Sequence, residues 1–121
     1  MGYYSNVRFN TTKEGYEKFK ASLAEDTKSW LFPNGKPEVY DEEDGEVIFG
    51  WDDIKWYQHS YQEIDDAMGA YRNLREDGVP FEYVRVGEEY GDCEYEEEMT
   101  EYLEPYKLHR HIEPMMTINI Y

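Results

Sequence analysis

The chain has 121 residues, of which 40% are hydrophobic and 17% aromatic, and its formal net charge is −16. This length predicts a single domain over residues 1–121, and so many aromatic residues argue against intrinsic disorder. The charge argues against direct contact with nucleic acid or an anionic membrane, because phosphate binding requires lysine and arginine, and it favours a basic protein partner.

The single cysteine, Cys93, excludes an internal disulfide. The N-terminal segment has no apolar signal-peptide core, and no apolar run approaches the roughly twenty residues that cross a bilayer. We therefore expect the protein in a reducing cytoplasm.

The first half of the chain predicts a strand, a helix and a hairpin. Residues 3–10 alternate apolar and polar side chains as a half-buried strand does. Thr11 and Glu14 form a capping box, which predicts a helix to about residue 24. Residues 26–37 are expected to be a loop. Strands at 38–41 and 46–51 flank an Asp44-Gly45 turn, and a bulge is expected near residues 52–53.

The second half predicts a second helix and further strands. Ser60 and Glu63 form another capping box, before a helix with an apolar stripe that ends near Gly78. Residues 81–86 are expected to be a strand. The acidic segment 87–104 could contain a strand, or a short helix around 97–103, and a last strand is expected at 111–121.

This order predicts the α+β class. We expect a ferredoxin-like β-α-β-β-α-β arrangement with an acidic excursion and an additional C-terminal strand. The helices would cover one face of a mostly antiparallel sheet.

The charge is concentrated in two windows. Residues 38–53 contain eight acidic residues and no base, and residues 82–104 contain ten acidic residues and one base, Arg85. Like charges repel, so the windows are either solvated sheet edges that discourage aggregation or a surface for a partner. In a ferredoxin-like sheet the two windows could lie on a common edge. The predicted partner-binding residues are Glu88, Glu89, Asp92, Glu94, Glu96, Glu97 and Glu98, with Asp41, Glu42, Glu43 and Asp44 second.

Metal and catalytic sites are less favoured. The EF-hand pattern fails at Gly45, although a non-standard cation site at Glu88, Glu89, Asp92 and Glu94 stays open. His109 and His111 could hold a transition metal with Glu113, but a solvated pair fits better. Acidic neighbours should raise the pKa of Cys93, which makes it a poor nucleophile. Without a catalytic motif, we expect no enzyme, no metal site and no cofactor.

Three segments, MGYYSNV, WDDIKWY and VRVGEEYGD, resemble a group of small acidic proteins encoded by phages and prophages of bacteria. The resemblance implies a phage origin and a small α+β domain, and it supplies no catalytic residues. By size and charge the chain is also similar to anti-CRISPR and other anti-defence inhibitors, several of which mimic DNA.

The leading hypothesis is thus a non-enzymatic inhibitor in the bacterial cytoplasm. It would bind a basic, nucleic-acid-binding host protein, such as a CRISPR effector, through acidic side chains. The first alternative is a carboxylate-rich metal-binding protein or acid–base enzyme. The second is a homo-oligomeric interaction module, for instance a homodimer that pairs an exposed edge strand.

Overall fold

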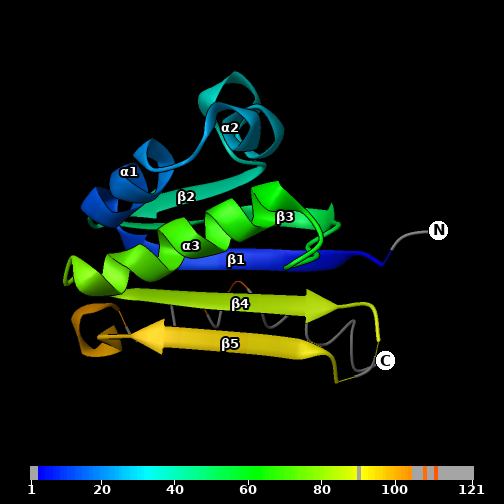
Figure 1. Ribbon diagram of the computed structural model, residues 1–121. Coiled ribbons are helices and arrows are strands. Elements are labelled where there is room, and N and C mark those ends of the chain that lie inside the picture. The colour runs from blue at the N-terminus through cyan, green and yellow to red at the C-terminus, as the bar shows by residue number, and fades with distance from the viewer. Residues whose placement is uncertain (1–2, 90, 105–107, 109–110, 112–121) are drawn as a thin grey trace.

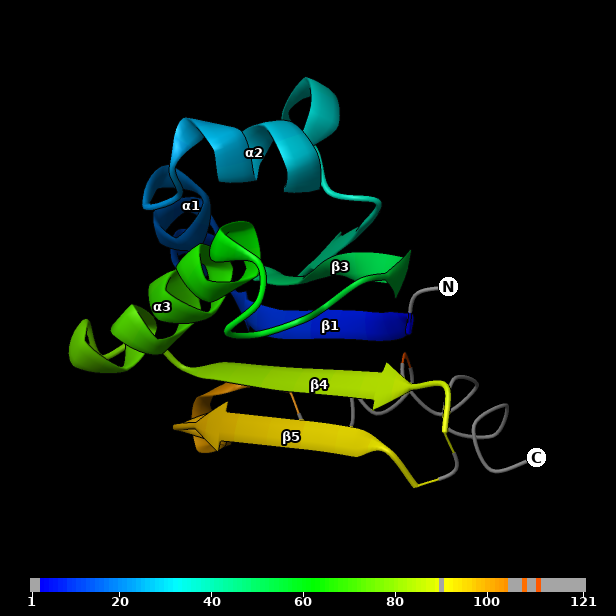
Figure 2. The same ribbon diagram turned by 45° about the vertical axis from the view of Figure 1, so that its right-hand side comes forward.

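A computed structural model gives the fold and describes residues 3–89, 91–104, 108 and 111. Three helices cover one face of a five-stranded antiparallel sheet (Figures 1 and 2). The strands are β1 (Ser5–Thr12), β2 (Val39–Glu43), β3 (Glu46–Ile54), β4 (Phe81–Gly87) and β5 (Cys93–Glu98), in the spatial order β2-β3-β1-β4-β5. The helices are α1 (Lys13–Ala21), α2 (Glu25–Leu31) and α3 (Gln62–Glu76). The α+β class and the helix-covered antiparallel sheet are therefore confirmed.

Both predicted helices are present, but both predicted capping boxes are wrong. The cap of α1 is Thr12, whose hydroxyl accepts from the Gly15 N–H at 3.0 Å. Thr11 belongs to β1 instead, and its hydroxyl donates to the Pro80 carbonyl. The N-cap residue of α3 is Tyr61, and its side chain makes no capping hydrogen bond. Thr11 is engaged by the residue that precedes β4, which local spacing does not reveal.

Helix α2 occupies the segment that was predicted to be a loop. The N–H of Ala24, at its start, donates to Asp66 of α3 at 2.9 Å, and the Thr27 hydroxyl donates to the same carboxylate at 2.7 Å. Leu31 at its end is buried in the core. The cap of α2 comes from a distant helix, so the local sequence lacks a start signal.

The hairpin and its bulge agree with the prediction. Asp44 and Gly45 both have positive φ, 53° and 81°, as the tight turn between β2 and β3 requires. The pairing of β1 with β3 shifts register between Ser5 and Val7, and opposite that shift Asp53 has a φ of 50°. The bulge therefore changes the direction of the end of β3.

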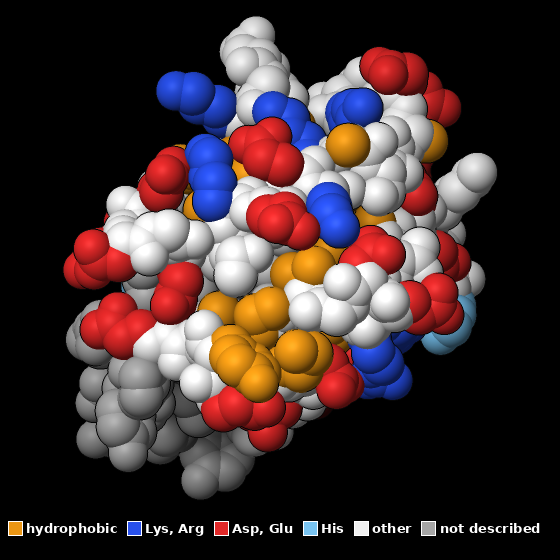
Figure 3. Space-filling model, turned by 90° about the vertical axis from the view of Figure 1, so that its left-hand side faces the viewer, with side chains coloured by type: hydrophobic (Ala, Val, Ile, Leu, Met, Phe, Trp, Pro, Cys, Tyr) orange, Lys and Arg blue, Asp and Glu red, His pale blue; other side chains and the backbone are white. Residues whose placement is uncertain are grey.

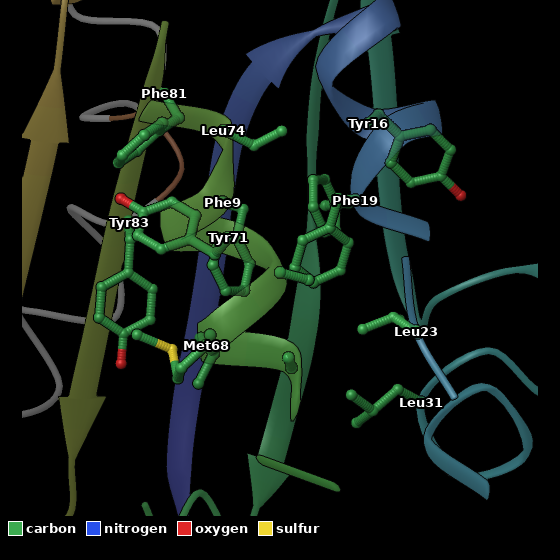
Figure 4. Close-up of a cluster of buried hydrophobic side chains, with 14 of the residues drawn as sticks. Phe9, Tyr16, Phe19, Leu23, Leu31, Met68, Tyr71, Leu74, Phe81 and Tyr83 are labelled. Atoms are coloured by element: carbon green, nitrogen blue, oxygen red, sulfur yellow. The ribbon is translucent and has the colours of Figure 1, made fainter. Parts of the chain in front are cut away.

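The core between sheet and helices is aromatic (Figure 4). Phe9 is 1% exposed and lies at its centre, with ring centroids 4.9 Å from Tyr71, 5.1 Å from Tyr83 and 5.2 Å from Phe49. The tyrosines and phenylalanines that argued against disorder thus form the contact between the two layers.

A smaller apolar cluster lies on the sheet face opposite α1, α2 and α3, which we call the open face because none of these helices covers it. It consists of Ile48, Val84, Val86 and Leu108, so Leu108 packs beneath the sheet and buries the middle of this face. The strand predicted at 111–121 lies outside the described residues except for His111, which is helical. No helix in the described part of the chain is long and apolar enough to span a membrane.

Candidate acidic interaction surface

The two acidic windows lie at opposite edges of the sheet, so the expectation of a common edge is wrong. The first window runs through the edge strand β2 and its neighbour β3, while the second runs through β4 and the edge strand β5. The two windows are separated because β1 pairs with both β3 and β4 and lies between them. Only the end of the second window returns, where the Glu104 N–H donates to the Glu46 carboxylate at 2.9 Å.

Three of the predicted site residues on β5 are paired inside the molecule. Glu94 lies 3.2 Å from Arg85, Glu96 lies 3.1 Å from Arg72, and Glu98 lies 2.9 Å from Arg75. Alternation along the strand directs all three toward the helices. These glutamates hold β5 against its neighbours. Figure 3, which shows one end of the molecule, likewise has Lys and Arg side chains interspersed with Asp and Glu.

The arginine partners were absent from the predicted site, although the sequence contains a signal for them. Arg72 and Arg75 are three residues apart on α3, a rise of about 4.5 Å, and Glu96 and Glu98 are two residues apart on a strand, a rise of about 6.6 Å. The two spacings are similar enough for long side chains to pair. Using that signal requires knowing that α3 lies beside β5.

Asp92 is the most deeply engaged predicted residue. Its carboxylate lies 2.7 Å from Arg85 and accepts from the Tyr3 hydroxyl. These hydrogen bonds, the one from Arg85 above all, hold the pKa of Asp92 below its usual range. Arg85 also donates to the Ser5 hydroxyl at 3.0 Å, so four of its five guanidinium N–H donors bind inside the molecule. A pocket of about 370 Å³ adjoins this network, and the Arg85 charge in its wall is already balanced by Asp92 and Glu94.

On the open face, two glutamates contact a tyrosine instead of an arginine. The Tyr95 hydroxyl lies 2.7 Å from the Glu82 carboxylate and 2.9 Å from that of Glu97. Neither glutamate has a lysine or arginine partner among the residues that the structure describes. Tyr95 is 50% exposed, and burial together with both carboxylates raises the pKa of its hydroxyl. Glu97 is therefore the first-choice residue that lies exposed on the open face, with no basic partner in the described part of the chain.

The turn between β4 and β5 carries two further predicted residues. Glu88 is exposed and accepts from the Tyr4 N–H at 3.2 Å. The Glu89 N–H donates to the Tyr3 hydroxyl at 2.9 Å, and its side chain is also exposed. These contacts fix the turn to the N-terminal segment.

The second-choice residues on the hairpin also differ in their surroundings: two contact a basic side chain and two are exposed at the turn. Glu42 lies 3.0 Å from Lys13, and hydrogen bonds from Tyr40 and Lys13 lower the pKa of Glu42. Asp41 lies on the open face, 3.0 Å from the His111 ring. Glu43 and Asp44 are exposed, and with Glu104 they offer carboxylate oxygens within 4.8 Å of one another.

These contacts also bear on the metal and thiol hypotheses. The cation site proposed at Glu88, Glu89, Asp92 and Glu94 is not assembled, because the carboxylates of Asp92 and Glu94 bind Arg85 instead. Among the described residues the structure groups a different set, Glu43, Asp44 and Glu104. His109 and Glu113 lie outside the described residues. Cys93 is exposed, and desolvation first, then Asp92 and Glu94, raises the pKa of its thiol, as expected.

No protein-family model, no curated protein and no solved structure matches the chain. Function is therefore inferred from the geometry of the chain itself.

Proposed function

We propose that the protein is a non-enzymatic binding protein that presents the β4–β5 edge of the open face, where Glu82, Tyr95 and Glu97 lie, and the acidic turns beside it, to a basic surface of a nucleic-acid-binding host protein. The observation that carries this proposal is the unequal pairing of its acids. On the helix side Glu94, Glu96 and Glu98 each have an arginine. On the open face Glu82 and Glu97 have none among the described residues.

The composition of this surface favours protein recognition. Tyr95 lies between Glu82 and Glu97, and the hydrogen bonds fix the position of the ring. A tyrosine held in this way offers a rigid contact area at low entropic cost, while the carboxylates attract a basic partner. Carboxylates, like DNA phosphates, accept hydrogen bonds from arginine, and on this ground we propose DNA mimicry by an anti-CRISPR-like inhibitor of phage origin in the bacterial cytoplasm.

We also propose a ferredoxin-like core for this fold. The order β2-β3-β1-β4 with α1 and α3 on one face fits that arrangement. Helix α2 and strand β5 depart from it. Strand β5 is then an addition to the β4 edge, and it carries most of the first-choice site residues.

The alternatives have weaker support. An acid–base enzyme needs a carboxyl with a raised pKa, whereas Asp92 and Glu42 have lowered ones. A homodimer through β5 would place its glutamates opposite one another, which is unfavourable. A cation site retains one observation, the Glu43, Asp44 and Glu104 group, and calorimetric titration with calcium or manganese tests it.

The experiment uses three immobilised baits: the wild-type protein, E82Q/E97Q and the control E17Q/E25Q. Both variants remove two negative charges, but Glu17 and Glu25 lie on the exposed sides of α1 and α2. Proteins retained from a bacterial lysate at low salt are eluted with high salt and identified.

The proposal predicts that wild type and E17Q/E25Q retain the same nucleic-acid-binding protein, that E82Q/E97Q loses it, and that an oligonucleotide releases it. Equal loss by both variants would assign the effect to net charge, and equal retention by all three baits would show that Glu82 and Glu97 are not needed; either result would contradict the proposal.

A further inference from the structure

A groove beside the exposed ring of Trp30 combines aromatic walls with acidic side chains. The larger part of the groove, lined by Glu38 and Asp53, has a volume of about 590 Å³. A second part of about 430 Å³, lined by Tyr61 and Glu63, adjoins it at the Trp30 ring. Ile54 lines both parts. Trp30 is 41% exposed, in a protein whose other two tryptophans are buried.

The walls of this Trp30 groove are preformed. The Trp30 ring packs edge-on against Tyr61, with centroids 5.9 Å apart, and Tyr61 stacks on Tyr57 at 5.3 Å. Asp53 is at the bulge with a φ of 50°, and its N–H donates to the Asn6 side chain at 3.0 Å. Such strain in a non-glycine residue is typical of positions where a bulge redirects a side chain.

The acidic side chains that line the groove favour a positively charged ligand. The carboxylates of Asp53 and Glu63 have no ion-pair partner among the described residues. Asp52 is already paired with Arg8 at 2.9 Å. Two lysines, Lys36 and Lys55, line the groove beside four acidic residues, so its lining keeps a net negative charge. The Lys55 ammonium lies over the Tyr4 ring, 5.7 Å from its centroid.

We infer that the Trp30 groove binds an arginine side chain of the basic partner, with the guanidinium against the Trp30 ring and its charge beside Asp53. Arginine fits better than lysine because its planar, weakly hydrated head stacks on an indole ring while its edge donates to a carboxylate. This inference rests on the proposed function for the source of the arginine. It adds a contact at the end of β3, separate from Glu82 and Glu97.

The test is a titration of the ¹⁵N-labelled protein with the peptide acetyl-Gly-Arg-Gly-amide, followed through the indole N–H signals. Trp30→Phe assigns the Trp30 signal. The matched ligand replaces arginine with citrulline, which has the same shape without the charge. The matched proteins are Asp53→Asn, which tolerates positive φ, and Asp77→Asn, an exposed aspartate at the end of α3.

We expect a saturable shift of the Trp30 signal in the millimolar range that the citrulline peptide does not produce. Asp53→Asn should weaken binding about fivefold, as the loss of one ionic contact does, and Asp77→Asn should leave it unchanged. No shift of Trp30, or equal shifts with both peptides, would overturn the inference. Partner binding that still depends on Glu82 and Glu97 would then show that only the groove inference had failed.

Discussion

At the scale of single residues, Arg85 is the side chain on which the acidic turn depends. It is the one base in the window 82–104, and its side chain is 11% exposed. It pairs with Asp92 and Glu94, and Asp92 in turn accepts from Tyr3. Part of this window therefore serves the fold as well as the surface, which a count of charges cannot reveal.

We predict that Arg85→Met lowers the free energy of unfolding by about 2 kcal/mol. Breaking a fully buried ion pair costs about 3–5 kcal/mol, and the cost here is smaller because Asp92 and Glu94 are 31% and 46% exposed. Urea denaturation measures the change. The control Arg75→Met breaks an exposed pair and should cost less than about 0.5 kcal/mol. Equal costs for the two variants would contradict this ranking.

The same pair predicts a pH dependence. Because the folded pKa of Asp92 is lowered, its contribution to stability is complete above the unfolded value of about 4 and is lost as the pH falls through the folded value. The difference in unfolding free energy between wild type and Arg85→Met should therefore shrink between about pH 5 and pH 2. Urea denaturation across this range measures it, and a constant difference would exclude the role given to Asp92.

At the scale of elements, local signals were reliable where local interactions decide the structure. The Asp44-Gly45 turn and the apolar stripe of α3 are such cases. Helix α2 was missed because Asp66 caps it from α3. The sequence indicated strand or helix after Gly87, and both occur, β5 and a single 3₁₀ turn at Thr100–Tyr102.

Leu108 tests the apolar cluster on the open face. It is 2% exposed and packs with Ile48, Val84 and Val86. We predict that Leu108→Ala costs about 2–4 kcal/mol in thermal or urea unfolding, the range for a buried leucine. Tyr102→Ala, at a 68% exposed position on the same return segment, should have little effect. A cost below about 0.5 kcal/mol for Leu108→Ala would contradict the packing of Leu108 in this cluster.

At the scale of the whole molecule, the structure divides the negative charge into an internally paired part and an outward part. The sequence located both windows, but it could not assign each glutamate to a face, because that depends on which strands pair and which helix lies above them. Glu96 and Glu97 are neighbours in the chain, yet one pairs with Arg72 and the other lies beside Tyr95. A site made of consecutive acidic residues is therefore split by strand alternation.

The most direct measurement is the affinity of the captured partner for wild type, E82Q/E97Q and E96Q/E98Q at several salt concentrations. Both variants lose two negative charges, E82Q/E97Q from β4 and β5 and E96Q/E98Q from β5 alone, but only the first alters the open face. We predict that E82Q/E97Q weakens binding about tenfold with a shallower salt dependence, and that E96Q/E98Q stays within about threefold of wild type. Equal weakening by both variants, or none by E82Q/E97Q, would contradict the assignment of the open face as the binding surface.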